Sequence, residues 1–234
     1  MIGIVVPCYN EEAVLEDLIK EFEVLRKELD FDLILVDDGS IDKTSSIIKQ
    51  ASKKKRWIKS ISHSINQGIA QSLKDGFSYA VGHGYDAVAQ MDADLTHPPE
   101  TLVQMFEELE RGADLVVASR YTGKGGMKNV PRWRVVLSIA GNKAFKCVLR
   151  IKTSDSTSGF RLARREFHER LKLKADSFGI QLEMTVRAER AGFLVKEVPF
   201  VLINREKGTS KFKLRYLIGY IPLMIKLMVS RNRS

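Results

Sequence analysis

Residues 86–112 read "DAVAQMDADLTHPPETLVQMFEELERG", and this stretch decides the fold. It opens with a short apolar run typical of a buried strand, and it closes with a helix that begins at prolines and ends at a glycine. Between the two lie Asp92 and Asp94, one residue apart. A strand, an acidic turn and a helix in this order form the repeating unit of an α/β sheet.

The same unit repeats on both sides of this stretch. Strands are predicted over residues 2–7, 31–40, 57–63, 86–94 and 113–120, and helices over 11–29, 42–54, 67–84 and 98–112. Asn10 is the expected N-cap of the first helix. The alternation predicts an α/β fold with a mostly parallel, doubly wound sheet flanked by helices. Ligands bind beyond the carboxyl ends of such strands, so the polar segments "PCYNEE", "VDDGS", "MDADLTH" and "ASRYTG" are predicted to converge on one crevice.

The second half of the chain is less regular. It predicts helices over residues 133–150 and 178–192, a turn into a short strand within 154–166, and an extended segment over 193–206. Residues 216–229 form an apolar stretch interrupted by Pro222 and Lys226. We therefore expect one main domain over residues 1–211 and an amphipathic tail over residues 212–234.

Charge divides the chain in two. Residues 1–119 carry 12 Lys and Arg against 21 Asp and Glu, a net charge of −9, whereas residues 120–234 carry 26 against 8, a net charge of +18. The basic half indicates an anionic partner, such as phosphates, nucleic acid or an anionic membrane. A solvated basic surface is the other interpretation, but it does not explain the change of sign.

Missing motifs exclude several classes of protein. The first strand is followed by no Gly-rich dinucleotide fingerprint, and the chain has no Gly-Lys-Ser/Thr phosphate loop, which argues against a hydride-transfer enzyme or a P-loop ATPase. Cys8 and Cys147 match no metal spacing and favour a reduced, cytosolic setting. The N-terminus lacks the features of a signal peptide.

The two neighbouring carboxylates repel each other unless a cation or a proton lies between them. A divalent ion with oxygen ligands, Mn²⁺ or Mg²⁺, would bridge Asp92 and Asp94 to a diphosphate. In the alternative interpretation, one of them caps the following helix and the other is solvated.

Six motifs in order make the chain recognisable: "VVPCYNEE", "LVDDGSIDKT", "NQGIAQSLKDG", "MDADLTHPPE", "ASRY" and "DSTSGFR". Together they resemble family-2 inverting glycosyltransferases with a GT-A fold, over about residues 2 to 215. "MDADLTHPPE", followed by "SRY" and "NREKGTSK", resembles the dolichyl-phosphate mannose synthase branch in particular.

The resemblance implies a pocket for a nucleotide sugar, with GDP-mannose as the favoured donor. The residues that it implies for donor binding are Pro7, Tyr9, Glu11, Asp37, Asp38, Gly68, Asp92, Ala93, Asp94, Arg205 and Lys211. Either Asp37 or Asp38 would contact the base or ribose. The metal, Mn²⁺ or Mg²⁺, would be held by Asp92 and Asp94. Relatives commonly carry Gln where this chain has Thr96, whose shorter side chain suits contact with the metal through water.

The resemblance also implies a polyprenyl phosphate as the acceptor. Arg120, Ser138 and either Arg132 or Arg134 would hold the acceptor phosphate, which is already ionised and needs no strong base. Asp155 and Glu183 would bind sugar hydroxyls or orient these arginines. Alternatively, Asp155 would act as the base that related enzymes use on sugar hydroxyls. The implied catalytic residues are thus Asp94, Arg120, Arg134 and Asp155.

The tail favours a lipid acceptor. Its apolar stretch, residues 216–229, has 14 residues and is too short to cross a bilayer, which takes about 20 apolar residues. Basic flanks suit a helix in the membrane interface, and a helix in the core or in a dimer interface is the alternative. We expect a cytoplasmic enzyme, peripheral on the membrane and without a transmembrane span. A UDP-glucose-dependent transferase is the nearest alternative function. A nucleic-acid-binding module is less favoured, because aromatic residues do not interleave with the Lys and Arg runs.

Overall fold

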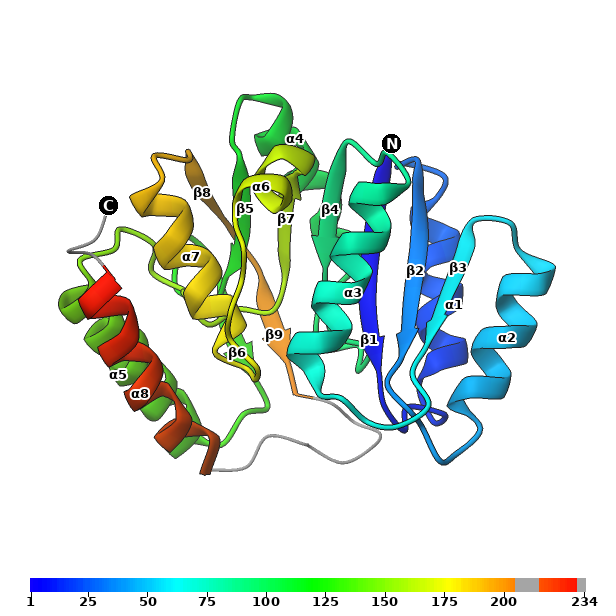
Figure 1. Cartoon of the computed structure of the whole chain (residues 1–234), viewed down its shortest axis with the longest axis horizontal. Coiled ribbons are helices and arrows are strands. Elements are labelled where there is room, and N and C mark those ends of the chain that lie inside the picture. The colour runs from blue at the N-terminus through cyan, green and yellow to red at the C-terminus, as the bar shows by residue number, and fades with distance from the viewer. Residues whose placement is uncertain (205–214, 231–234) are drawn as a thin grey trace.

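A computed structural model describes residues 1–204 and 215–230, the side chains of 215–219 and 230 excepted. Among these residues, seven strands form one sheet in the order β3-β2-β1-β4-β7-β5-β8 (Figure 1). The strands are β1 (Ile2–Cys8), β2 (Phe31–Asp37), β3 (Ile58–Ser62), β4 (Ala87–Gln90), β5 (Leu115–Ser119), β7 (Arg161–Arg164) and β8 (Val195–Pro199). Every neighbouring pair is parallel except the two pairs that β7 makes, with β4 and with β5. The predicted mostly parallel sheet is confirmed.

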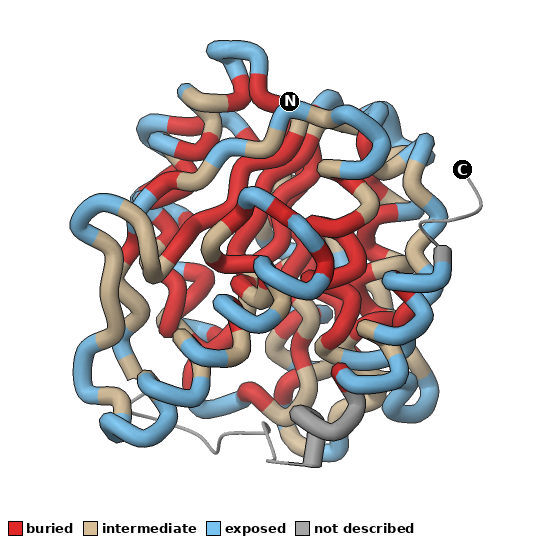
Figure 2. Tube along the Cα trace, turned by 90° about the vertical axis from the view of Figure 1, so that its left-hand side faces the viewer, coloured by how far each residue is buried: buried red, intermediate tan, exposed pale blue. Residues whose placement is uncertain are grey.

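Helices cover both faces of the sheet. They are α1 (Leu15–Leu25), α2 (Thr44–Lys54), α3 (Ile69–Gly82), α4 (Thr101–Glu110), α5 (Arg132–Leu149), α6 (Arg165–Arg170), α7 (Ile180–Arg190) and α8 (Arg215–Ser230). Alternate strand residues point to opposite faces, so Ile4 and Val6 belong to the apolar cluster under α1, α2 and α4. Val5 belongs to the cluster under α3, α6 and α7. Figure 2 shows the strands as the buried centre between these layers.

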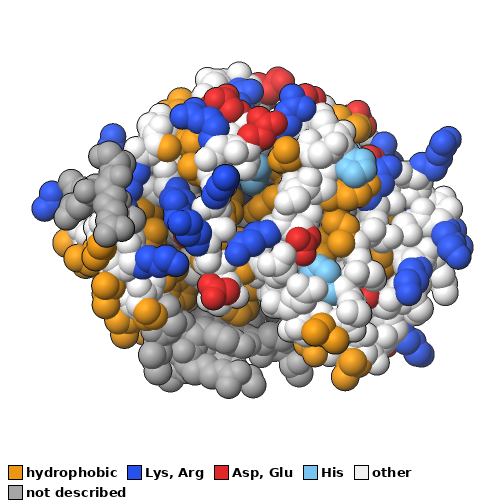
Figure 3. Space-filling view, viewed as in Figure 1, with side chains coloured by type: hydrophobic (Ala, Val, Ile, Leu, Met, Phe, Trp, Pro, Cys, Tyr) orange, Lys and Arg blue, Asp and Glu red, His pale blue; other side chains and the backbone are white. Residues whose placement is uncertain are grey.

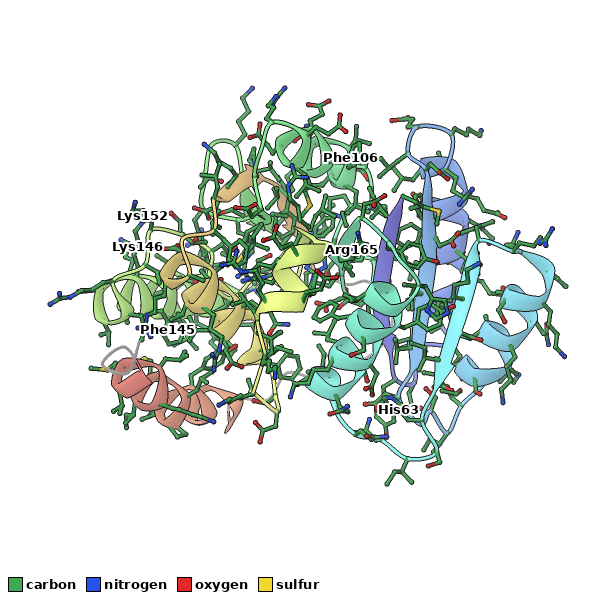
Figure 4. All side chains as sticks on the ribbon, turned by 45° about the horizontal axis from the view of Figure 1, so that its top comes forward. His63, Phe106, Phe145, Lys146, Lys152 and Arg165 are labelled. Atoms are coloured by element: carbon green, nitrogen blue, oxygen red, sulfur yellow. The ribbon has the colours of Figure 1, made fainter. Side chains whose placement is uncertain are left out.

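A third apolar cluster holds α5 and α8 to α7. It consists of Leu149, Ile151, Leu182, Val186, Tyr220 and Leu227. The two helices lie side by side in Figures 1 and 4, and the rings of Phe145 and Tyr220 are 5.3 Å apart. One face of α8 therefore packs on the rest of the chain. None of the described helices is long and apolar enough to cross a membrane.

The predicted start of the first helix is wrong. Helix α1 begins at Leu15, and the residues before it form turns. Asn10 has a φ of 51°, and its side chain accepts a hydrogen bond from the Ile41 N–H (3.0 Å) instead of capping the helix. The bond joins the loop after β1 to the loop after β2.

The prediction also missed two short elements and the pairing of a third. Helix α6 follows β7 directly, where no helix was expected. The strands β6 (Gly126–Lys128) and β9 (Val201–Ile203) pair in parallel as a small second sheet. They lie near the edge of the main sheet where β1, β2 and β4 end (Figure 1).

Candidate active site

The predicted polar segments lie at one edge of the sheet. Strands β1, β2, β4 and β5 run in the same direction and end at the lower edge in Figure 1. Pro7 and Tyr9 are half-buried there, and Glu11 is buried. The backbone N–H of Glu11 donates to the Thr44 hydroxyl (2.8 Å) at the start of α2. The motif "VVPCYNEE" is therefore held against the start of α2.

Asp38 organises the loop that leads into α3. Its carboxylate accepts hydrogen bonds from the Asn66 amide (2.9 Å) and from the backbone N–H groups of Gln67 (2.8 Å) and Gly68 (2.9 Å). It also contacts the Nδ1 atom of His63 (2.8 Å). Gly68, with a φ of 90°, is the last residue before α3. Asp38 thus fixes the start of this helix at the edge of the sheet.

His63, which the sequence did not single out, bridges two carboxylates. It follows β3 at the carboxyl edge of the sheet (Figure 4). Its Nε2 atom lies 3.1 Å from the Asp75 carboxylate, which also accepts a bond from Gln71 (2.9 Å). A carboxylate oxygen thus lies at each ring nitrogen of His63, and the ring links the loop after β2 to α3. The available signal was a histidine at the end of the strand predicted over residues 57–63.

Asp37 and Gly39 shape the neighbouring turn. Asp37 is buried and accepts hydrogen bonds from the Ser40 N–H (3.1 Å) and the Ser62 hydroxyl (3.4 Å). Gly39 has a φ of 69°, and a Cβ atom there would lie 2.4 Å from the carbonyl carbon of Ile65. Only glycine permits this approach of the two loops.

The acidic turn after β4 has one exposed and one buried carboxylate. The side chain of Asp92 is 41% exposed, whereas Asp94 and Ala93 are buried. Asp94 Oδ1 accepts hydrogen bonds from the hydroxyl (2.6 Å) and the N–H (3.1 Å) of Thr96. In this structure Thr96 therefore orients Asp94.

His97 supports the same turn from below. Its Nδ1 atom accepts a hydrogen bond from the Asp92 N–H (3.1 Å). Its ring stacks on Phe160 with a centroid distance of 5.1 Å and packs edge-on against Phe200. His97 was not among the predicted site residues, although it stands within "MDADLTHPPE".

The carboxylate pair fits a hard divalent cation. A Cβ atom on Gly159 would lie 3.4 Å from Asp92 Oδ1, so the absent side chain leaves room beside this carboxylate. The described residues contain no group of three or more His, Cys, Asp and Glu side chains that could hold a metal ion. Mg²⁺ commonly binds one or two carboxylates and completes its shell with waters and substrate phosphates. Asp92 and Asp94 provide such a set.

Arg120 and Asp155 form a buried ion pair beyond β5. Asp155 has no exposed surface, and its oxygens accept bonds from Arg120 Nε (2.7 Å), Nη2 (2.6 Å) and the backbone N–H (3.0 Å). Burial opposes the charge of Arg120, but the hydrogen bonds and charge of Asp155 outweigh it and raise the pKa of Arg120 above its usual range. Asp155 therefore orients this arginine.

The loop that carries Asp155 is held by other charged side chains. Glu197 accepts hydrogen bonds from the N–H groups of Ser154 (2.9 Å) and Asp155 (3.0 Å). Arg161 is 1% exposed and donates to the carbonyl of Ser158 (2.7 Å), and burial lowers its pKa to about 10. These contacts make the loop a fixed part of the edge.

Helix α5 brings the remaining predicted acceptor residues. Ser138 lies 2.6 Å from the Tyr121 hydroxyl, and the guanidinium of Arg120 lies 5.3 Å from the Tyr121 ring. Arg132 and Arg134 are exposed in the first turn of α5, and Arg134 lies over Trp133. Tyr121 thus contacts both Ser138 and Arg120 and links the two predicted acceptor residues.

Two predicted donor residues, Arg205 and Lys211, lie outside the described residues. Glu183, expected near the sugar or the arginines, instead accepts hydrogen bonds from the N–H groups of Lys174 and Ala175 and from Arg187.

Comparisons with known proteins agree with the predicted family. The model of "Glycosyl transferase family 2" matches residues 3–172. The chain is 31% identical over 231 residues to a dolichol-phosphate mannosyltransferase of Pyrococcus furiosus, covering 97% of this chain and 63% of that protein. It is 33% identical over 212 residues to a polyprenol monophosphomannose synthase of Mycolicibacterium smegmatis, covering 89% of this chain and 79% of that protein.

Solved structures confirm the GT-A fold. A glucosyl-3-phosphoglycerate synthase of Mycobacterium tuberculosis, in complex with Mn²⁺, UDP and glucosyl-3-phosphoglycerate, matches with a TM-score of 0.72 and 20% identity. The match covers 99% of this chain and 79% of that one. The same enzyme with Mg²⁺ and UDP matches with a TM-score of 0.71 and 21% identity.

Proposed function

This chain belongs to glycosyl transferase family 2, and we propose that it transfers a hexose from a nucleotide sugar to a polyprenyl phosphate. GDP-mannose is the favoured donor and mannose the transferred sugar, because both relatives at 31% and 33% identity are named for mannose transfer. The observation that carries the proposal is the Arg120–Asp155 pair. Since Asp155 is buried and engaged by Arg120, it is poorly placed to take a proton from a sugar hydroxyl. An acceptor phosphate needs no such base, because its oxygen is already ionised at neutral pH.

The donor site is proposed between the first three motifs. The loop that Asp38 fixes and the turn at Gly39 would receive the nucleoside, with Pro7, Tyr9 and Glu11 on its other side. A divalent ion, Mn²⁺ or Mg²⁺, held by Asp92 and Asp94, would neutralise the charge of the leaving diphosphate. The solved relatives with Mn²⁺ or Mg²⁺ and UDP support a divalent ion. Thr96 would set the direction of the Asp94 carboxylate.

The acceptor site is proposed around Arg120 and the start of α5. A guanidinium held by Asp155 presents a fixed cation to the acceptor phosphate, and Ser138 with Arg132 or Arg134 would complete the site. Holding this phosphate behind the anomeric carbon gives in-line displacement and inversion. Arg205 and Lys211 would add positive charge at the diphosphate.

We propose that α5 and α8 rest on the cytoplasmic face of the membrane. Both helices expose large apolar side chains, namely Trp133, Val136, Leu137, Val148, Ile221, Ile225, Met228 and Val229. Figure 3 shows hydrophobic side chains at the lower left, where these helices lie, with Lys and Arg side chains above them. Apolar contact with basic flanks suits an anionic interface. The catalytic unit of residues 1–211 and the tail of residues 212–234 would then act together on a lipid.

A thermal-shift panel tests the donor site. GDP, UDP, GDP-mannose and UDP-glucose are each added with Mn²⁺, Mg²⁺ or EDTA, and the GDP compounds are expected to stabilise the protein only with metal. Asp94→Asn is the matched control, because it removes a charge and keeps the shape. Stabilisation by UDP compounds would indicate the UDP-glucose-dependent reaction, and stabilisation by none would contradict a nucleotide-sugar enzyme.

Two further assays test the acceptor. Radiolabelled sugar should pass to a polyprenyl phosphate, with inverted anomeric configuration in the product. Ile221→Ser with Ile225→Ser should weaken flotation with anionic liposomes, because both side chains are 56% exposed and absent from the core. Unchanged flotation would contradict docking through α8.

A further inference from the structure

Helix α5 buries one polar side chain in the middle of an exposed surface. Of its residues 132–149, only Asn142 and Leu149 are buried, at 4% and 3% exposure. Leu149 packs in the apolar cluster with α7 and α8. Asn142 faces the loop that carries Asp155. A buried amide on a helix of this kind has to be explained by its partners.

The amide of Asn142 forms four hydrogen bonds. Its Oδ1 atom accepts from the N–H (2.9 Å) and the hydroxyl (3.0 Å) of Ser156. Its Nδ2 atom donates to the Thr157 hydroxyl (3.0 Å) and to the Ser138 carbonyl (3.1 Å). An asparagine side chain can accept two bonds and donate two, so this set is complete. Asn142 therefore fixes the centre of the loop to α5.

Both bonds from Nδ2 lead towards Arg120. The Thr157 hydroxyl that accepts from Asn142 also accepts from Arg120 Nη2 (3.1 Å). The Ser138 carbonyl accepts from Asn142, and the Ser138 hydroxyl contacts the Tyr121 hydroxyl. The Tyr121 ring in turn lies under the Arg120 guanidinium. The position of the guanidinium thus depends on Asn142 through two short chains of contacts.

We infer that Asn142 is a positioning residue that holds Arg120 for the acceptor phosphate and couples the surface helix α5 to the acceptor site. This inference rests on the proposed function, and it adds a residue that none of the six motifs contains. The acceptor phosphate must lie in line with the reacting carbon, so a small displacement of its cation lowers the rate. Because α5 also exposes apolar side chains to the proposed membrane surface, the same residue links lipid docking to acceptor binding.

The test compares Asn142→Ala and Asn142→Asp with a control in the same helix. The control is Leu149→Ala or Leu149→Val, whichever lowers the melting temperature by the same amount as Asn142→Ala. Three quantities are measured: metal-dependent GDP binding, hydrolysis of the sugar nucleotide without lipid, and transfer to a polyprenyl phosphate. The Asn142 variants should keep GDP binding and hydrolysis within about twofold, while KM for the acceptor rises about tenfold, or about 1.4 kcal/mol. Asn142→Asp should raise it further, because it places a negative charge near the acceptor phosphate.

A spectroscopic measurement keeps the inference testable without turnover. The Nε–H of Arg120 donates to Asp155 (2.7 Å), so this proton should exchange slowly with water in the parent protein and in the Leu149 variant. The exchange is followed through the nitrogen-15 signal of Arg120 Nε. Asn142→Ala and Asn142→Asp should lose at least tenfold of this protection. If the Leu149 variant loses acceptor affinity and protection equally, or if neither changes in the Asn142 variants, the inference is wrong. A parent protein that binds GDP but transfers to no polyprenyl phosphate contradicts the proposed function alone, and the Arg120 signal then decides the inference.

Discussion

Replacing Asp155 with asparagine removes the negative charge from a buried ion pair at the edge of the sheet. Asp155 has no exposed surface, and the side chain of Arg120 is 13% exposed. In the parent, three N–H groups of Arg120 donate to two carboxylate oxygens. The amide of the variant offers one oxygen, so at least one of these donors faces an NH₂ group.

The expected loss of stability follows from this geometry. A charge-assisted hydrogen bond contributes about 1.5–3 kcal/mol, and removing one partner of a buried pair costs about 3–5 kcal/mol because the other charge is left buried and unpaired. We expect Asp155→Asn to lower the free energy of unfolding by about 3–5 kcal/mol. Arg120→Gln should recover part of this loss in the double variant, since the unpaired charge is then gone.

Urea unfolding of the four proteins in this cycle measures both values. If Asp155 is instead a base for a sugar hydroxyl, its replacement should abolish transfer and leave the free energy of unfolding nearly unchanged. A loss below about 1 kcal/mol, with no coupling to Arg120, would refute the structural role of the pair.

Three further changes test other parts of the chain. Asp94→Asn should keep the melting temperature within a few degrees and remove metal-dependent stabilisation by nucleoside diphosphates in a thermal-shift assay; retained stabilisation would contradict the metal assignment. Burial lowers the pKa of His168 to about 4, whereas an unfolded histidine titrates near 6.5, so protons favour the unfolded chain and stability is lost as the pH falls from about 6.5 to about 4. Between pH 7 and pH 4.5 the loss from this group should be about 2 kcal/mol and be absent in His168→Phe, as urea unfolding at the two pH values would show; an equal loss of stability in both proteins would disprove the cause. Gly39→Ala should cost about 2–3 kcal/mol in urea unfolding, because it forces alanine into a φ of 69° against Ile65; a change below about 0.5 kcal/mol would contradict the close packing of the two loops.

The local parts of the fold could be predicted from the sequence. An apolar run followed by "DDGS" or "DADLTH" identifies both a strand and the end at which its polar residues lie, since each signal is contained in about ten residues. The family motifs "ASRY" and "DSTSGFR" likewise contain Arg120 and Asp155, which the structure brings together. The predicted start of α1 was wrong, because the side chain of Asn10 bonds to the loop after β2. The local sequence pattern of an N-cap does not distinguish it from such a contact.

The residues that were missed depend on partners far along the chain. Asn142 reads as one polar position of an amphipathic helix, and only the fold shows that Ser156 and Thr157 lie against it. His63 and Asp38 are 25 residues apart. The direction of β7 also could not be predicted, because "FRLARRE" has the same apolar pattern in a parallel or an antiparallel strand.

The antiparallel strand β7 has a consequence for the order in which the protein can be made. Strands β1 to β4 come from residues 2–90 and pair among themselves, but the second edge of β4 waits for residues 161–164. Strand β5 leaves the ribosome earlier than both of its partners, β7 and β8. At about 5–20 residues per second, β4 stays uncovered for on the order of 4–14 s. An apolar strand with an open edge can pair with other chains. During this period each nascent polypeptide therefore depends on a chaperone or on dilution to avoid aggregation.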